Sequence, residues 1–152
     1  MRQEAQKPPN KAESVERKPR VLVFDQDAAD LARQSEFFEG KGFVVHRCSS
    51  VEKAMRYVER KSVDFALIDL GSPALEGFLV FRHFVRYHAH VLSVVTTRAG
   101  DTVGCREALA MGAMECLEKP VSGADLKWVI QKYVGSTVRQ NGRRKRAAEE
   151  NL

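Results

Sequence analysis

Short apolar runs alternate with stretches of helical period between residues 20 and 134. Each run is bounded by charged or turn-forming residues and shows no strict alternation of polar and apolar positions. Continuous apolar runs of four or five residues are typical of strands that are buried on both faces of a parallel sheet. The expected strands are 21–24, 43–45, 65–68, 91–95 and 114–117.

The segments between these runs have the period of amphipathic helices. The clearest stripe lies within residues 51–58, where apolar residues recur at i, i+3, i+4 and i+7, and Ser49 with Glu52 forms a capping box ahead of it. Ser122 and Asp125 supply the same kind of cap for the last helix. The other helices are expected around residues 31–38, 76–87, 105–109 and 126–133.

Five strands that alternate with five helices predict one doubly wound α/β domain over residues 20–134, a (βα)5 unit with helices on both faces of a parallel sheet. Residues 1–19 and 135–152 carry many charges and no apolar period, so we interpret them as a disordered basic arm and a flexible basic tail. In such a sheet, binding sites lie outside the carboxyl ends of the strands.

The net charge of +5 comes from the two ends of the chain. Residues 1–20 and 135–152 each carry +3, whereas residues 21–134 carry −1. The folded body is close to neutral, so the basic pI of the whole chain is weak evidence for a nucleic-acid-binding domain. The basic run at 143–146 fits a solvated end, a weak phosphate-contacting patch, or the start of a linker to an output domain.

Cysteine usage and hydropathy limit the setting of the protein. Three widely spaced cysteines, an odd number without metal-ligand spacing, predict reduced thiols in a cytosolic protein. No apolar run approaches the length of a membrane helix, and the N-terminus has no apolar core of a secretory signal. We therefore expect a cytoplasmic protein that does not contact a membrane.

Polar residues with complementary chemistry follow four of the five predicted strands. They are Asp25, Gln26 and Asp27 after the first strand, Asp69 after the third, Thr96 and Thr97 after the fourth, and Lys119 after the fifth. Each has an ordinary explanation alone; Asp27, for example, is placed to cap the next helix. Together they suit a divalent cation held by carboxylates and a phosphoryl group held by an ammonium and a hydroxyl. Asp69 is then placed to act as a carboxylate nucleophile.

In these motifs the sequence resembles the receiver domains of bacterial two-component response regulators. VLVFDQD resembles the first strand and acidic pair, and IDLGSPALEG resembles the phosphorylation motif, with Pro73 and Gly77 four and eight residues after Asp69. Thr97 resembles the switch threonine, and Lys119-Pro120, within GAMECLEKP, resembles the lysine-proline pair with a cis peptide bond. Four motifs in the same order and at matching intervals make the resemblance specific.

The resemblance implies a flavodoxin-like sheet in the order 2-1-3-4-5 and a role for each site residue. Asp69 would accept a phosphoryl group from a histidine kinase or a phosphotransfer protein, assisted by Thr97 and Lys119. Mg²⁺ would be held by Asp25, Gln26 and Asp69, with no further cofactor. Phosphorylation would change partner binding on the opposite edge. Such a module is not an enzyme in the usual sense, because its own aspartate is consumed and slowly regenerated.

Three residues depart from the pattern of the family. Gln26 stands where a carboxylate normally ligates Mg²⁺, Arg98 where a small residue normally follows the switch threonine, and Cys116 where an aromatic residue normally responds to phosphorylation. These departures leave open a degenerate receiver that signals without phosphorylation. The basic tail leaves open the N-terminal part of a DNA-binding transcription regulator, which would contact DNA only through a missing output domain.

Trp128 lies on the polar face of the last predicted helix, about 160–200° around the helix from the apolar stripe. An exposed tryptophan is a frequent anchor of protein interfaces, and in the family the fourth and fifth helices belong to the dimer surface. A homodimer through these helices is one interpretation. The other is a tryptophan that packs over neighbouring side chains of its own chain.

Overall fold

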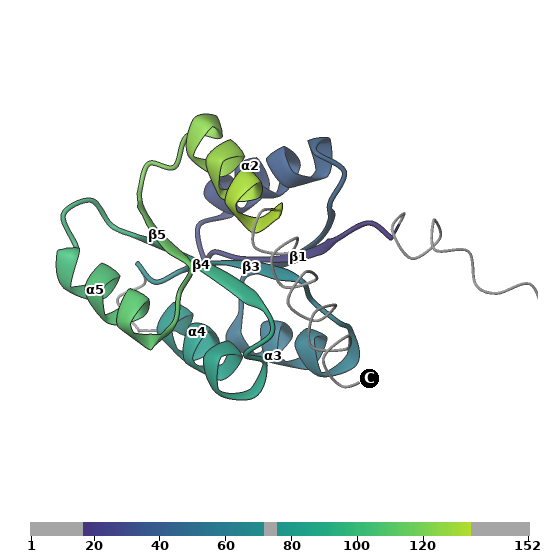
Figure 1. The fold of residues 1–152 in the computed structure, drawn as a ribbon, viewed down its shortest axis with the longest axis horizontal. Helices are drawn as coiled ribbons and strands as arrows, with labels where there is room; N and C mark the ends of the chain where they lie inside the picture. The colour runs from purple at the N-terminus through teal and green to yellow at the C-terminus, as the bar shows by residue number, and fades with distance from the viewer. Residues whose placement is uncertain (1–16, 72–75, 135–152) are drawn as a thin grey trace, which may run out of the picture.

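A five-stranded parallel sheet forms the centre of the molecule (Figure 1). The computed structural model describes residues 17–71 and 76–134. The strands lie in the order β2-β1-β3-β4-β5, and every neighbouring pair is parallel. This confirms the predicted (βα)5 fold and its strand order. The strands are β1 (Arg20–Phe24), β2 (Val44–Cys48), β3 (Phe65–Asp69), β4 (Leu92–Thr97) and β5 (Glu115–Glu118).

Helices cover both faces of the sheet, as expected for a doubly wound domain. One face is covered by α3, α4 and α5, and the other by α2 and the helix at residues 123–134 (Figure 1). In the described part of the chain no helix has the length and hydropathy that a membrane crossing requires. The labelled helices are α2 (Ala28–Gly40), α3 (Val51–Arg60), α4 (Glu76–Tyr87) and α5 (Thr102–Met111).

The alternation of side chains along each strand divides the core into two layers. Leu22 and Ile68 point toward α3, α4 and α5 and pack there with Phe81. Their neighbours Val23 and Leu67 point the other way and pack against α2 and the 123–134 helix. Because both faces are covered, the central strands need apolar residues at every position, which is why they are visible in the sequence.

Two local predictions were wrong. The second strand was expected at 43–45, but β2 begins at Val44 and runs to Cys48. It is an edge strand that pairs with β1 alone, so it carries polar residues that conceal its length in the sequence. The cap of α3 is Ser50, whose side chain accepts from the backbone N–H of Lys53, and not Ser49. Ser122 and Asp125, in contrast, form the expected reciprocal cap, with bonds of 2.9 and 3.1 Å.

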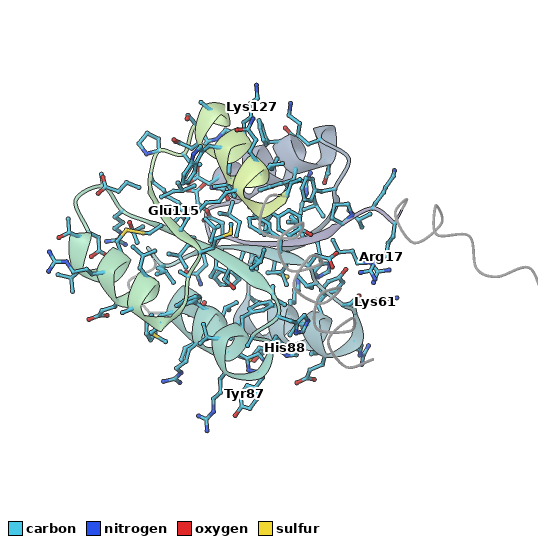
Figure 2. All side chains as sticks on the ribbon, viewed as in Figure 1. Arg17, Lys61, Tyr87, His88, Glu115 and Lys127 are labelled. Carbon is cyan, nitrogen blue, oxygen red and sulfur yellow. A yellow bond between two sulfur atoms is a disulfide. The ribbon has the colours of Figure 1, made fainter. Side chains whose placement is uncertain are left out.

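Residues 1–16 of the predicted arm and the whole predicted tail, 135–152, lie outside the described residues. Pro73 lies outside them too, and the basic run at 143–146 belongs to this tail. Arg17 is described, and its guanidinium lies 3.5 Å from the carboxylate of Asp64 and 3.1 Å from the hydroxyl of Ser62 (Figure 2). The carbonyl of Pro19 accepts a hydrogen bond from the N–H of Val44. Arg17 and Pro19, which belong to the predicted arm, therefore contact the folded domain.

Gly77 lies where the first turn of α4 passes directly against the end of β3. A Cβ at this position would lie 1.7 Å from the backbone oxygen of Asp69. Because an alanine there cannot be accommodated without movement of α4 or of the β3 end, the glycine is required for close packing. Because glycine has no side chain, α4 can lie directly against the backbone of Asp69.

We expect Gly77→Ala to lower the free energy of unfolding by about 3 kcal/mol, since backbone must move to relieve the contact. Gly40→Ala is the matched control, because a Cβ at Gly40 has no neighbour within 4 Å and should change stability by about 1 kcal/mol at most. Urea unfolding of both variants measures the difference. Equal effects would show that α4 does not approach Asp69 as closely as described.

Candidate functional site

Two carboxylates meet at the carboxyl edge of the sheet because of the register between neighbouring strands. Phe24 pairs with Ile68, so Asp25 and Asp69 follow at adjacent positions on β1 and β3. Both side chains point to the α2 side of the sheet, since they lie two residues beyond Val23 and Leu67. Asp25 is fully buried and Asp69 is 6% exposed. The site therefore begins with two acids that are removed from water.

Lys119 provides the positive charge that these acids need. Its Nζ lies 2.9 Å from Oδ2 of Asp25, 3.1 Å from Oδ2 of Asp30 and 3.4 Å from Oδ2 of Asp69. The backbone N–H of Lys119 donates to the carbonyl of Thr97 at 2.8 Å, which holds the residue against β4. The peptide bond between Lys119 and Pro120 is cis. One ammonium group thus bridges three carboxylates from three elements of the chain.

The carboxylate of Asp69 has one well-bonded oxygen and one more open oxygen. Oδ1 accepts hydrogen bonds from the Thr96 hydroxyl at 3.0 Å and from the Gly71 N–H at 3.1 Å. Oδ2 faces Lys119 across the longer 3.4 Å ion pair. These bonds fix the plane of the carboxylate, and they leave Oδ2 as the oxygen best placed to react.

Burial and charge shift the pKa values of this cluster in opposite senses. Burial raises the pKa of Asp25, partly offset by its hydrogen bond with Lys119, and the charge of Asp69 raises it further. Burial alone would lower the pKa of Lys119, but its hydrogen bonds with Asp25 and Asp30 and the charges of Asp25 and Asp69 raise it well above its ordinary value. Lys119 is therefore firmly charged, and its ammonium, together with the backbone N–H of Asp27, opposes the effect of burial on the pKa of Asp25.

A pocket of about 290 Å³ opens from this cluster to solvent. It is lined by Asp25, Gln26, Asp27, Asp30, Asp69, Gly71, Arg98 and Lys119. The amide nitrogen of Gln26 donates to the carboxylate of Glu76, so its amide oxygen is free to face a ligand. The Cγ of Arg98 lies 3.2 Å from the place where a Cβ on Gly71 would stand, so the arginine stem passes beside Asp69. The guanidinium is exposed at the mouth of the site.

Asp27 and Asp30 have structural partners of their own. The Asp27 side chain caps α2 by accepting from the N–H of Asp30 at 2.9 Å. Asp30 pairs with Arg33 at 2.6 Å as well as with Lys119. The expected capping role of Asp27 is thus observed. The buried Asp25 is engaged as well, since its Oδ1 accepts from the Asp27 N–H at 2.9 Å and its Oδ2 pairs with Lys119.

Thr97 does not contact Asp69, although the sequence grouped the two residues. Thr97 lies two residues after Val95, so its side chain points to the same, α5 side of the sheet. The Thr97 hydroxyl lies 3.5 Å from Sγ of Cys105 and 3.9 Å from Sγ of Cys116. The neighbouring hydroxyl of Thr96 takes the position beside Asp69 instead. Thr96 and Thr97 point to opposite faces of the sheet, and Asp69 pairs with Thr96 in the register of β3 and β4. Side-chain alternation along β4 is therefore the sequence signal that could have identified Thr96 as the partner of Asp69.

Cys105 and Cys116 form a disulfide, so the expectation of three reduced thiols was wrong. The two residues are widely spaced in the sequence, but α5 folds back against β5 and brings their Cα atoms to 5.6 Å, which is an ordinary distance for a disulfide. Cys48 is free and buried. The odd cysteine count was misleading because one cysteine belongs to the core.

The oxygen donors of the pocket fit a magnesium ion held by few protein groups. Asp25 and Asp69 supply carboxylates and Gln26 an amide oxygen, which are ligand types that Mg²⁺ accepts while keeping several waters. Within residues 17–71 and 76–134, no group of three or more histidine, cysteine, aspartate or glutamate side chains is placed to hold a metal. The reason is visible in the cluster: the third donor is an amide, and Lys119 lies between the two acids.

Five parallel strands in this order, with helices on both faces, define the flavodoxin-like class of α/β domains. The pattern of the response regulator receiver domain matches residues 21–131. The chain belongs to this family, whose members are receivers of two-component signalling systems.

The known proteins to which this chain is similar include regulatory proteins. The regulatory protein VanRc of Enterococcus gallinarum is 27% identical over 101 residues, which cover 66% of this chain and 42% of that protein. The acid tolerance regulatory protein ActR of Rhizobium meliloti is 25% identical over 118 residues, which cover 78% of this chain and 61% of that protein. The chain thus spans about two fifths to three fifths of the length of these relatives.

Solved receiver domains have the same fold. The response regulator receiver domain protein from Clostridium thermocellum is 27% identical, with a TM-score of 0.72 over 80% of this chain and 98% of that one. A CheY-like receiver domain protein from Methanospirillum hungatei is 21% identical, with a TM-score of 0.75 over 82% of this chain and 99% of that one. The second likeness concerns the fold alone.

We expect Lys119→Met to destabilise the protein in a pH-dependent way. Without the ammonium, burial raises the pKa of Asp25 further, so the native state binds a proton that the unfolded chain releases above its ordinary pKa of 3.8. Stability of the variant should therefore fall as the pH rises from about 4 to 7. The expected loss relative to wild type at pH 7 is about 3 kcal/mol, because a buried charge loses its partner.

Urea unfolding at pH 5 and pH 7 measures this effect. Lys132→Met is the control, since the ion pair of Lys132 with Glu115 is partly exposed and should contribute about 1 kcal/mol or less. A loss in Lys119→Met that is the same at both pH values would contradict the charge-balancing role of Lys119.

Proposed function

We propose that this receiver domain accepts a phosphoryl group on Asp69 from the phosphohistidine of a histidine kinase or a phosphotransfer protein. The observation that carries the proposal is the geometry around Asp69: one carboxylate oxygen is held by two hydrogen bonds, and the other faces a pocket and a charged lysine. A carboxylate that is oriented, partly desolvated and flanked by a cation suits in-line attack on phosphorus.

The chemistry follows from the residues that line the pocket. Oδ2 of Asp69 attacks phosphorus while the bond between phosphorus and the donor imidazole nitrogen breaks. The donor ring, protonated on its other nitrogen, keeps that electron pair and leaves as neutral histidine, and Asp69 becomes an acyl phosphate. Lys119 donates to a phosphoryl oxygen and balances its charge. Bound Mg²⁺, held by Asp25, Gln26 and Asp69, would neutralise charge on the phosphoryl oxygens. Water later hydrolyses the acyl phosphate and restores Asp69, so the domain is a consumed acceptor and not an enzyme in the usual sense.

A phosphoryl group on Asp69 would redistribute the contacts of Lys119 and Thr97. Lys119 is now shared among Asp25, Asp30 and Asp69, and a phosphoryl oxygen would compete for it. The Thr97 hydroxyl, now beside the two sulfur atoms, would have to rotate to donate to the phosphoryl group. Both residues are next to α5 or β5, since Thr97 contacts a cysteine in each and Lys119 directly follows β5. Phosphorylation would therefore alter the part of the molecule where a change in partner binding is expected.

The partners and setting are part of the same proposal. We place the protein in the cytoplasm, with a kinase or phosphotransfer protein as donor. DNA contact would come only through an output domain, a proposal that fits the transcriptional regulators named among its relatives. A homodimer through α5 and the 123–134 helix is consistent with Trp128, which is 46% exposed. The ammonium of Lys132 lies 4.8 Å from the centre of its ring and also pairs with Glu115. Trp128 therefore has an internal partner on one side and remains accessible to another molecule.

The alternative is a degenerate receiver that binds its partners without phosphorylation. Two observations favour it: the third metal donor is the amide of Gln26, which removes one negative charge from the site, and the Arg98 stem passes beside Asp69. Both would slow phosphoryl transfer. The same arginine carries five donors that suit a phosphoryl group, so its effect on the reaction depends on its direction when the donor binds.

Incubation with acetyl phosphate and Mg²⁺ tests the proposal, with intact-protein mass as the readout. Wild type should gain the mass of one phosphoryl group, and the gain should require Mg²⁺. Asp69→Asn should gain nothing, because the amide is not a nucleophile. Asp101→Asn is the matched control, since Asp101 caps α5 away from the pocket and asparagine caps equally well.

Two results would overturn the assignment. An adduct that persists in Asp69→Asn, or that maps to Asp25 or Asp27, would move the acceptor elsewhere. A wild-type protein that gains no phosphoryl group, with and without added reductant, would favour the degenerate receiver.

A further inference from the structure

The Cys105–Cys116 disulfide joins α5 to β5 next to the candidate site. Cys105 is the fourth residue of α5 and Cys116 the second residue of β5. Cys116 pairs in register with Val95 of β4, two residues before Thr97. The Thr97 hydroxyl lies 3.5 and 3.9 Å from the two sulfur atoms. The disulfide therefore lies against the residue whose backbone carbonyl also holds Lys119.

The other cysteine does not compete for this chemistry. Cys48 is fully buried, and burial raises the pKa of its thiol to about 11, so it stays protonated and unreactive near neutral pH. Cys105 and Cys116 are only partly buried. A small disulfide or thiol reagent can thus approach this pair and not the third cysteine.

We propose that Cys105 and Cys116 are a reversible thiol–disulfide pair through which the redox state of the surroundings controls the Thr97 hydroxyl and the contact between α5 and β5. Disulfides that occur in a reducing compartment are usually transient and redox-sensing. The effect on phosphorylation and the reducing, cytoplasmic setting rest on the proposed function, whereas the thiol–disulfide exchange of the pair does not. The domain would then respond to two inputs, phosphorylation at Asp69 and oxidation at this pair.

The oxidant is a low-molecular-weight disulfide, and the exchange balances in two steps. The thiolate of one cysteine attacks one sulfur of the reagent, breaks its S–S bond and releases one thiol, which leaves a mixed disulfide. The thiolate of the second cysteine then attacks the protein sulfur of that mixed disulfide and releases the second thiol. Two protein thiols lose two electrons and two protons in total, and the reagent disulfide becomes two thiols.

Reduction changes the space around Thr97. Two sulfur atoms that are no longer bonded must separate to van der Waals contact, about 3.5 Å or more, which is well beyond a covalent S–S bond. The Thr97 hydroxyl already lies beside both sulfur atoms, at 3.5 and 3.9 Å. The separated thiols therefore crowd this hydroxyl, and they release the covalent link that holds α5 to β5. Both effects favour rotation of Thr97 toward the pocket, so the reduced form should be the one that accepts a phosphoryl group more readily.

The redox pair is tested first without any phosphorylation. The full chain is equilibrated in mixtures of reduced and oxidised glutathione, alkylated, and mapped by peptide mass. Cys105 and Cys116 should become protected together as the oxidised fraction increases, while Cys48 does not change. The amide resonance of Thr97 in a ¹⁵N-labelled sample should shift in the same mixtures. A pair that stays alkylatable under oxidising conditions, or a disulfide that contains Cys48, would overturn the proposal.

Coupling to the candidate site is tested by the rate of the acetyl phosphate adduct in each redox state. We expect the reduced protein to react about fivefold faster or more than the oxidised protein, as for a modest coupling between two sites. Cys105→Ser and Cys116→Ser should each abolish the dependence on redox state, and Cys48→Ala should retain it. Equal rates in both states would overturn the coupling and leave Asp69 as acceptor. Absence of any adduct would overturn the proposed function, and the thiol mapping and the Thr97 resonance would still decide the redox pair.

Discussion

The structure of the site depends on one positive charge, the partly buried ammonium of Lys119. Asp25 is fully buried at the end of the central strand β1, and a carboxylate in that position is costly unless a cation lies within hydrogen-bond distance. Lys119 meets this requirement, and the same ammonium group reaches Asp30 and Asp69. These three ion pairs hold together four parts of the chain: the segment after β5, the first turn of α2, and the ends of β1 and β3. A phosphoryl group on Asp69 would draw on this same charge, which links acceptor chemistry to the packing of the edge.

The two faces of the sheet separate two kinds of chemistry. Side chains that point to the α2 side include Asp25 and Asp69 together with the Thr96 hydroxyl, and they form the polar cluster. Side chains of the opposite phase include Thr97 and Cys116, which lie toward α5. The two adjacent threonines of β4 thus have different contacts: Thr96 orients the carboxylate of Asp69, and Thr97 contacts the disulfide. Communication between the two faces passes through the backbone of β4, since the Thr97 carbonyl holds Lys119.

Much of this arrangement could be predicted from the sequence, because the central strands are buried on both faces and appear as apolar runs. The (βα)5 fold was predicted for that reason, whereas the strand order came from the resemblance to receiver domains. Asp25, Asp69 and Lys119 were placed together because each follows a predicted parallel strand and such strands end at the same edge of the sheet. The edge strand β2 was misplaced because one of its sides is exposed and its pattern is mixed. The partner of Asp69 on β4 depended on the phase of Thr96 and Thr97, which requires the register.

The disulfide was beyond the reach of sequence spacing. Its cysteines are 11 residues apart and belong to a helix and a strand, so their approach depends on how α5 packs against β5. Gly77 shows the opposite case, since the sequence motif marked it and the structure gives the steric reason. Distances between elements therefore had to come from the structure, whereas the identity of the elements did not.

A crystal structure of the protein with Mg²⁺ and beryllofluoride, a mimic of the phosphoryl group, tests the central claim most directly. The account predicts beryllofluoride bound to Oδ2 of Asp69, with Nζ of Lys119 within hydrogen-bond distance of a fluorine and farther from Asp25 than the present 2.9 Å. Beryllofluoride bound elsewhere, or bound to Asp69 while Lys119 keeps its contact with Asp25 and makes none with the ligand, would contradict it.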